Sequence, residues 1–159
     1  MFKRLRKLAE NATNLNQKIL LRIVFNETEV QDLILDLNRI EQLFKKGIDA
    51  EGDIIGLYSP VTEELTKGQS FGYGGGGSKS KRAGQPIFLL DTKEFYQSFK
   101  VKVLDDGFVI QADALKDDGT DLTEQYGKQI LGLTDKSRNE IIKEILPMVI
   151  QETRKALTR

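Results

Sequence analysis

A glycine-rich stretch in the middle of the chain constrains the fold more than any other sequence feature. Residues 68–85 contain seven of the 14 glycines in this 159-residue chain. Glycine loses more conformational freedom on folding than any other residue, so it weakens helices and strands. We therefore predict a flexible or partner-ordered loop here, within a single domain spanning residues 1–159.

The composition removes several kinds of chemistry. The chain has no Cys, His or Trp, and its 24 Lys and Arg balance 24 Asp and Glu. Without Cys or His there is no thiolate nucleophile, imidazole base, disulfide or zinc site of the usual ligands. The zero net charge argues against bulk attraction to nucleic acid or an anionic membrane. An enzyme built from this chain would have to use carboxylates, Lys, Tyr or bound Mg²⁺.

The start of the chain resembles a secretion signal only in its basic residues. Lys3, Arg4, Arg6 and Lys7 are followed by polar residues and not by the apolar core that a signal peptide requires. The most apolar run, residues 19–25, is far too short to span a membrane. We expect synthesis in a cytoplasm and no membrane partner.

Two amphipathic helices are predicted in the first third of the chain. Apolar residues recur at spacings of three and four over residues 2–24 and again over residues 30–44. A strand at residues 19–25 is the alternative for the end of the first helix. Asn26 and Glu29 suit a capping box for the second helix, and Gly47 is predicted to end it.

The remaining sequence predicts an α+β fold with a small antiparallel sheet. Asp105, Asp106 and Gly107 form a turn signal between strands at 100–104 and 108–112, which makes the clearest hairpin. Local cap and periodicity signals place the other elements. These are a strand at 53–58, a helix from Ser59-Pro60 to Lys67, a helix at 92–98 capped by Asp91, one turn at 122–126 closed by Gly127, and a final helix capped by Thr134, in which Pro147 is expected to cause a kink unless the helix breaks there.

Three apparent motifs have ordinary explanations. Ser78 separates the glycine run from Lys79, which breaks the spacing of a phosphate-binding loop. A carboxylate metal site in a hydrolase would have to use Asp91, Asp113 and Asp121, the widely spaced acids. Basic clusters at both chain ends and in the loop allow a nucleic-acid-binding module as the alternative function, although the balanced net charge favours solvated ends as their explanation.

The glycine-rich loop also carries candidate contact residues. Its aromatic side chains are more typical of protein contacts than of base contacts, and its basic side chains could meet phosphate groups. We therefore treat five residues as a candidate interface: Phe71, Tyr73, Lys79, Lys81 and Arg82.

Three short segments, taken in order, are similar to a known protein family. Residues 56–62 read Gly-Leu-Tyr-Ser-Pro-Val-Thr before the basic loop, residues 89–99 read Leu-Leu-Asp-Thr-Lys-Glu-Phe-Tyr-Gln-Ser-Phe before the hairpin, and residues 130–134 read Ile-Leu-Gly-Leu-Thr before the last helix. In this order they resemble the virion-morphogenesis, or tail-completion, proteins of tailed bacteriophages. The matching residues are Tyr58, Ser59, Pro60, Thr62, Leu90, Asp91, Thr92, Phe95, Ser98, Leu131, Gly132, Leu133 and Thr134.

The resemblance implies a structural virion protein of the head–tail neck or tail end. Such a protein would assemble as a homo-oligomeric ring of six or twelve copies, contact the portal or connector and tail proteins, and meet nucleic acid only by proximity. The motif residues would shape the subunit and would not act as catalysts, so the resemblance implies a non-enzymatic protein that needs no cofactor.

Overall fold

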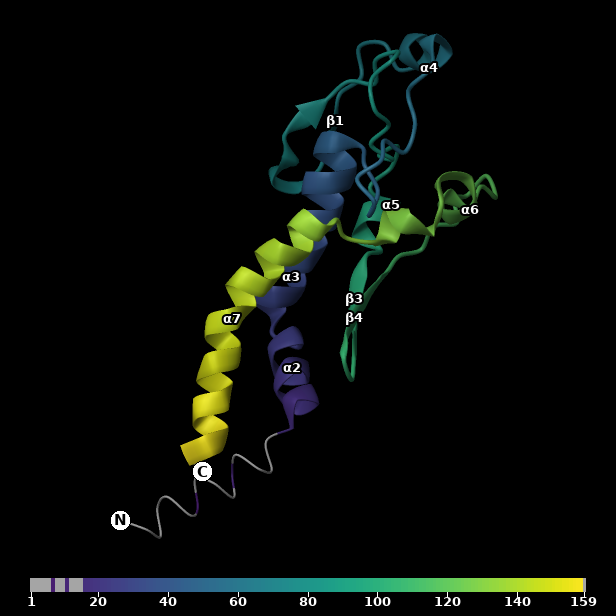
Figure 1. The fold of residues 1–159 in the computed structure, drawn as a ribbon. Coiled ribbons are helices and arrows are strands. Elements are labelled where there is room, and N and C mark those ends of the chain that lie inside the picture. The colour runs from purple at the N-terminus through teal and green to yellow at the C-terminus, as the bar shows by residue number, and fades with distance from the viewer. Residues whose placement is uncertain (1–6, 8–10, 12–15, 159) are drawn as a thin grey trace.

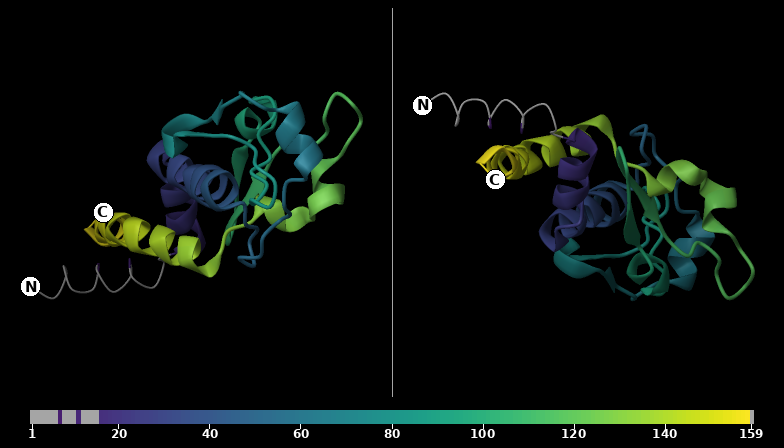
Figure 2. Two further views of the ribbon diagram at one scale, coloured as in Figure 1. Left: turned by 90° about the horizontal axis from the view of Figure 1, so that it is seen from above. Right: turned by 90° about the horizontal axis from the view of Figure 1, so that it is seen from below.

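The computed structural model describes Lys7, Asn11 and residues 16–158, and the fold has the predicted α+β class. Helices α2 (Gln17–Phe25), α3 (Thr28–Asp36) and α7 (Asp135–Thr158) lie together on one side of the molecule. The antiparallel hairpin of β3 (Lys100–Leu104) and β4 (Gly107–Gln111) lies beside them (Figures 1 and 2). Within the described residues, no helix is long and apolar enough to cross a membrane.

Asn16 interrupts the helix that the sequence pattern predicts over residues 2–24. Asn16 has an extended backbone, and its side chain accepts a hydrogen bond from the backbone N–H of Lys18, which starts α2 at Gln17. The predicted single helix over 2–24 is therefore wrong at this point, and its first part falls largely outside the described residues. The alternative strand at residues 19–25 is also wrong, because these residues are helical and bury Leu20, Val24 and Phe25.

The second helix spans the predicted region, but its second half is a π-helix. Helix α3 continues directly into a π-helical segment, η1 (Leu37–Lys46), which Gly47 ends with a φ of 64°. The predicted end at Gly47 is confirmed, but the capping box is wrong. Asn26 instead closes α2, where its side-chain amide donates to the carbonyl of Arg22 at 2.6 Å.

Residues 48–58 form turns, not the predicted strand. Only isolated bridges are present, between Ile48 and Ile54 and between Leu57 and Pro86. The expected helix start at Ser59 is confirmed: its hydroxyl accepts a hydrogen bond from the N–H of Thr62 at 3.1 Å, and Pro60 begins α4 (Pro60–Leu65).

The glycine-rich segment folds back on its own chain. Strand β1 (Phe71–Gly72) pairs with β2 (Ser78–Lys79), and the short 3-10 turn η2 (Gly74–Gly76) joins them. A Cβ atom on Gly76 would lie 2.5 Å from Cδ1 of Phe44, so the glycine allows the turn to press against η1. The flexibility of the segment stays a prediction, but the strand pairing and the close approach to Phe44 anchor it within its own chain.

The hairpin and the last helix follow the sequence closely. Leu104 pairs with Gly107 across the predicted Asp105-Asp106 turn. Gly127 ends α6 (Leu122–Tyr126), and a 3-10 turn, η3 (Lys128–Leu131), leads to α7. The Thr134 hydroxyl accepts from the N–H of Ser137 at 3.2 Å, which confirms the predicted cap, and α7 continues through Pro147 without a break.

Phe88 lies at the centre of the core that joins these parts. Its ring contacts those of Phe44, Tyr58 and Phe71, with centroid distances of 5.4, 5.4 and 6.1 Å. Phe44 comes from η1, Tyr58 precedes α4 and Phe71 belongs to the glycine-rich segment. The aromatic cluster therefore holds the loops and the helical layer in one core.

Candidate functional site

A pocket of about 790 Å³ brings together two of the three segments that carry the family resemblance. It opens between the start of α4, the segment that precedes α5 (Glu94–Gln97) and the loop that follows β4. Eight of the motif residues line it: Tyr58, Ser59, Thr62, Leu90, Asp91, Thr92, Phe95 and Ser98. The sequence predicted these residues as a set but did not predict that they share one pocket.

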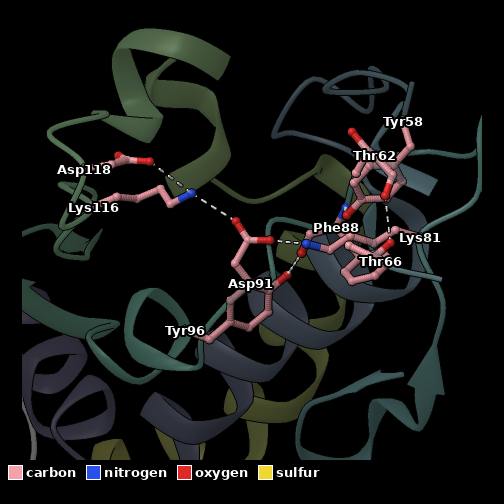
Figure 3. A network of polar contacts seen from close by, with 9 residues as sticks. All are labelled: Tyr58, Thr62, Thr66, Lys81, Phe88, Asp91, Tyr96, Lys116 and Asp118. Carbon is pink, nitrogen blue, oxygen red and sulfur yellow. Dashed lines mark hydrogen bonds and ion pairs between the residues drawn. The ribbon is translucent and has the colours of Figure 1, made fainter. Parts of the chain in front are cut away.

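The carboxylate of Asp91 is the electrostatic centre of this pocket (Figure 3). One carboxylate oxygen accepts from the ammonium group of Lys81, and the other accepts from Lys116 at 3.0 Å. Lys116 also lies 3.8 Å from a carboxylate oxygen of Asp118. We call Lys81, Asp91 and Lys116 the lysine–aspartate bridge. It ties the glycine-rich segment, the segment before α5 and the loop after β4 to one another.

Lys81 is the most enclosed member of the bridge. Its side chain is 6% exposed, and its Nζ lies 4.3 Å from the ring centroid of Phe71 and 5.8 Å from that of Tyr58. A buried ammonium group is costly unless it is paired, and Asp91 and the two aromatic faces supply the compensation. The prediction that Asp91 caps the following helix is wrong, because α5 has no side-chain cap and Asp91 is turned toward the two lysines.

Tyr58, which lines the pocket, and the buried Tyr96 both bond the backbone of Phe88. The Tyr96 hydroxyl donates to the carbonyl of Phe88, and the Tyr58 hydroxyl accepts from the N–H of Phe88 at 3.2 Å (Figure 3). Burial raises the pKa of both hydroxyl groups above the usual value of 10.0. Both tyrosines are therefore neutral at physiological pH and serve as fixed hydrogen-bonding groups.

The pKa values of Asp91 and Lys116 are also displaced away from neutral pH. Partial burial alone would raise the pKa of Asp91, but hydrogen bonds from Lys81 and Lys116 outweigh it and lower the pKa below 3.8. The hydrogen bond to Asp91 raises the pKa of Lys116 above 10.5. General acid–base catalysis works best with a group that titrates near the working pH. Asp91, Lys116 and the two tyrosines are instead fixed in single protonation states.

The three acids that were considered for a metal site serve separate structural roles. Asp121 accepts hydrogen bonds from the N–H groups of Thr123 and Glu124 at the start of α6. Asp113 accepts from the N–H of Leu115, and Asp91 is occupied by lysines. In the part of the chain that the structure describes, no group of three acidic side chains is placed to hold a metal ion.

Four of the five candidate loop residues face the protein. Lys79 donates to the carbonyl oxygens of Phe44 and Lys45 at the end of η1, at 3.0 and 3.1 Å. The Tyr73 hydroxyl donates to the carbonyl of Tyr96 and accepts from Arg39 at 3.1 Å. Phe71 and Lys81 pack together as described above. Arg82 alone of the five is exposed.

The third motif segment, residues 130–134, does not line the pocket and directly precedes α7. Two buried amides of η1 hold it: Asn38 donates to the carbonyl of Gly132 at 2.6 Å, and Gln42 donates to the same carbonyl at 3.1 Å. The Gln42 side-chain oxygen also accepts from the N–H of Thr134 at 2.9 Å. Leu131 and Leu133 flank this turn, and Leu133 is buried. The motif therefore fixes how the chain enters α7.

Sequence reasoning missed Arg39, Lys116 and the two amides. Asn38 and Gln42 are spaced four residues apart within an apolar stripe, and polar residues at such positions are a signal of buried hydrogen bonding. Lys116 is a single basic residue in an acidic stretch, which is a weaker signal. No protein-family model, curated protein or solved structure matches this chain.

Proposed function

We propose that this protein is a structural component of a tailed-phage virion, of the head–tail neck or tail-completion type. It assembles as a homo-oligomeric ring that joins or seals the tail to the capsid connector. The observation that carries the proposal is the shared pocket: the motif segments at 58–62 and 90–98 meet there and are fastened by the lysine–aspartate bridge. This bridge fastens three loop segments to one another and so makes this face of the subunit rigid. A subunit needs a rigid surface to form regular contacts in a ring.

The chemistry of the pocket favours this structural role over catalysis. Asp91, Lys116, Tyr58 and Tyr96 have pKa values displaced away from neutral pH, and each side chain makes hydrogen bonds within the protein. Groups held in this way support a shape and are poorly suited to exchange protons with a substrate.

Exposed apolar side chains on α7 and α2 favour assembly into an oligomer. Ile142, Leu146 and Ile150 are exposed along one side of α7, four residues apart, and Ile19 and Ile23 are exposed on α2. Contiguous apolar surface on a small protein is a common sign of a protein–protein interface. A head-to-tail interface of this kind closes into a ring when its rotation allows.

Mass and location test the proposal together. Native mass spectrometry and negative-stain microscopy of the purified full chain should show rings, with the resemblance favouring six or twelve copies. Fractionated phage particles should contain the chain at the neck or tail end. A protein that stays monomeric at all concentrations and is absent from particles would refute the proposal.

The nucleic-acid alternative makes a different prediction. Within the glycine-rich segment only Arg82 of the three basic candidates is exposed, since Lys79 and Lys81 are engaged by the protein. Binding through the chain ends would still lose affinity steeply as salt rises. Filter binding of DNA by a monomer with such a salt dependence would favour the alternative over ring assembly.

A further inference from the structure

An apolar groove runs between the hairpin and the first half of α7. Its volume is about 1010 Å³, and we call it the hairpin groove. Leu21 and Phe25 of α2, Phe108 and Ile110 of β4, and Ile141 and Ile145 of α7 are among its lining residues. It adjoins the pocket that contains the lysine–aspartate bridge, because Asp113, Ala114 and Leu115 line both.

The apolar surface continues from this groove along α7. Ile142 lines the groove and is 56% exposed, and Leu146 and Ile150 follow it at 53% and 43%. Residues spaced by four share one helix face, so these side chains extend the groove as a continuous stripe. A groove next to such a stripe suits an amphipathic helix, which inserts side chains at the same spacing.

The hairpin turn gives one end of the groove a negative charge. Asp105 and Asp106 form the turn; Asp106 lines the groove, and Asp105 has one exposed ion pair, with Arg22 at 3.4 Å. Asp113, Asp121, Lys128 and Arg138, which also line the groove, have balanced charges. A ligand with a basic end would therefore be oriented with that end at the hairpin turn.

The N-terminal segment of the chain has the complementary pattern. Residues 1–15 carry four basic residues and one acidic residue, with the basic residues clustered at positions 3–7. Leu5, Leu8, Ala12 and Leu15 recur at helical spacing. As a helix, residues 2–15 would be about 21 Å long.

We propose that the hairpin groove of one copy binds the N-terminal segment, residues 2–15, of a second copy. The apolar face of the segment fills the groove, and its basic cluster meets Asp105 and Asp106. The proposal rests on the ring assembly proposed above and identifies the surfaces that form its contact. Because the segment and the groove are different surfaces, the contact is head-to-tail and can repeat around a ring.

Within one chain, Asn11 contacts the end of α7 that lies away from the groove. The side-chain amide of Asn11 donates to the carbonyl of Leu157 at 2.9 Å, near the C-terminal end of α7. The groove lies by the N-terminal half of the same helix, beside Ile141 and Ile145. Asn11 and the hairpin groove of one chain therefore lie toward opposite ends of α7.

The lack of cysteine in the native chain allows a clean cross-linking test. Full-length Leu8→Cys and Val109→Cys variants are mixed and treated with a short bismaleimide, with Leu65→Cys replacing Val109→Cys as the control. Val109 lines the groove, whereas Leu65 is 75% exposed on α4 and does not. We expect a cross-linked heterodimer from the first mixture at several times the yield of the control mixture. Equal yields would overturn the proposal.

Charge reversal tests the orientation. Asp106→Lys should lower the cross-linking yield, and Arg4→Glu on the other partner should restore it, because the reversed pair is again opposite in charge. Asp117→Lys, an equally exposed change outside the groove, is the control. An unchanged yield with Asp106→Lys, or a loss that Arg4→Glu does not restore, would overturn the orientation.

The groove contact and the virion function can fail separately. Ile142→Glu should weaken self-association roughly tenfold or more, because it places a charge against the bound segment. Rings that form normally with this variant and without the cross-link would overturn the groove contact and leave the proposed function standing. A specific cross-link in a protein absent from phage particles would support the contact and refute the virion function.

Discussion

Lys81 and Asp91 form an ion pair in which the two partners differ sharply in exposure. The lysine side chain is 6% exposed and the aspartate side chain 54%. The aspartate can be solvated without its partner, whereas the lysine cannot. The enclosed lysine therefore depends on the aspartate more than the aspartate depends on the lysine.

Asp91→Asn should destabilise the protein by about 1–3 kcal/mol, because it leaves the Lys81 ammonium group enclosed without a counter-charge. Urea unfolding followed by circular dichroism measures the change. Asp117→Asn, at an exposed position in the loop after β4, is the matched control and should have little effect. Equal stability of the two variants would show that solvent reaches Lys81.

The same asymmetry predicts a partial rescue. Lys81→Met removes the enclosed charge while Asp91 keeps Lys116 as a partner at 3.0 Å. The double variant of Lys81→Met and Asp91→Asn should therefore be more stable than Asp91→Asn alone, because no unpaired charge remains inside. A double variant as unstable as the sum of the single changes would contradict this account.

Acid should lower the free energy of unfolding, because it protonates Asp91 in the lysine–aspartate bridge. The pKa of Asp91 is lower in the folded state than its ordinary value of 3.8. A depressed carboxyl pKa stabilises the fold above the unfolded-state pKa, and this stabilisation is lost as the pH falls through the folded-state pKa. The free energy of unfolding should decline below about pH 4, and Asp91→Asn should make that decline shallower. Urea titrations between pH 3 and 7 measure both slopes, and identical slopes would argue against the pairing.

Substitutions at the neighbouring glycines Gly75 and Gly76 distinguish the effect of close packing on stability from the effect of backbone entropy. A Cβ atom on Gly76 would meet Phe44 at 2.5 Å, whereas nothing lies within 4 Å of one on Gly75. Gly76→Ala should destabilise the protein by about 1–3 kcal/mol, because the turn must move away from η1. Gly75→Ala should be neutral or stabilising by up to about 1 kcal/mol. Thermal unfolding compares the two, and amide exchange in residues 71–79 should quicken only in Gly76→Ala.

The features that the sequence predicts correctly depend on neighbouring residues. The hairpin follows from alternating residues on both sides of Asp105-Asp106, and the caps at Ser59 and Thr134 need only backbone groups within three residues. Gly47 and Gly127 end their helices through positive φ angles, which glycine adopts without strain. In each case one short segment supplies both partners.

The features that sequence reasoning misses depend on distant partners. Asp91 has the local pattern of a helix cap, but lysines 10 and 25 residues away compete for its carboxylate. Residues 53–58 have strand-like composition, but a strand also needs a partner strand from elsewhere in the chain. In this part of the structure only isolated bridges form, at Ile54 and Leu57. The motif residues were predicted as a set from resemblance, while their shared pocket follows from the tertiary fold.

The buried amide of Gln42 is the last of these long-range features, and its role can be measured. Its side chain bonds both the carbonyl of Gly132 and the N–H of Thr134, more than 85 residues away in the chain. Gln42→Leu places an apolar side chain in η1 and leaves the N–H of Thr134 without this partner, while the Gly132 carbonyl keeps its bond from Asn38, so it should cost about 1–3 kcal/mol. The neighbouring Glu41→Leu, at a more exposed position, should cost less than about 1 kcal/mol. Urea unfolding compares them, and equal costs would mean that water satisfies the turn before α7 and that the amide does not fix the entry of this helix.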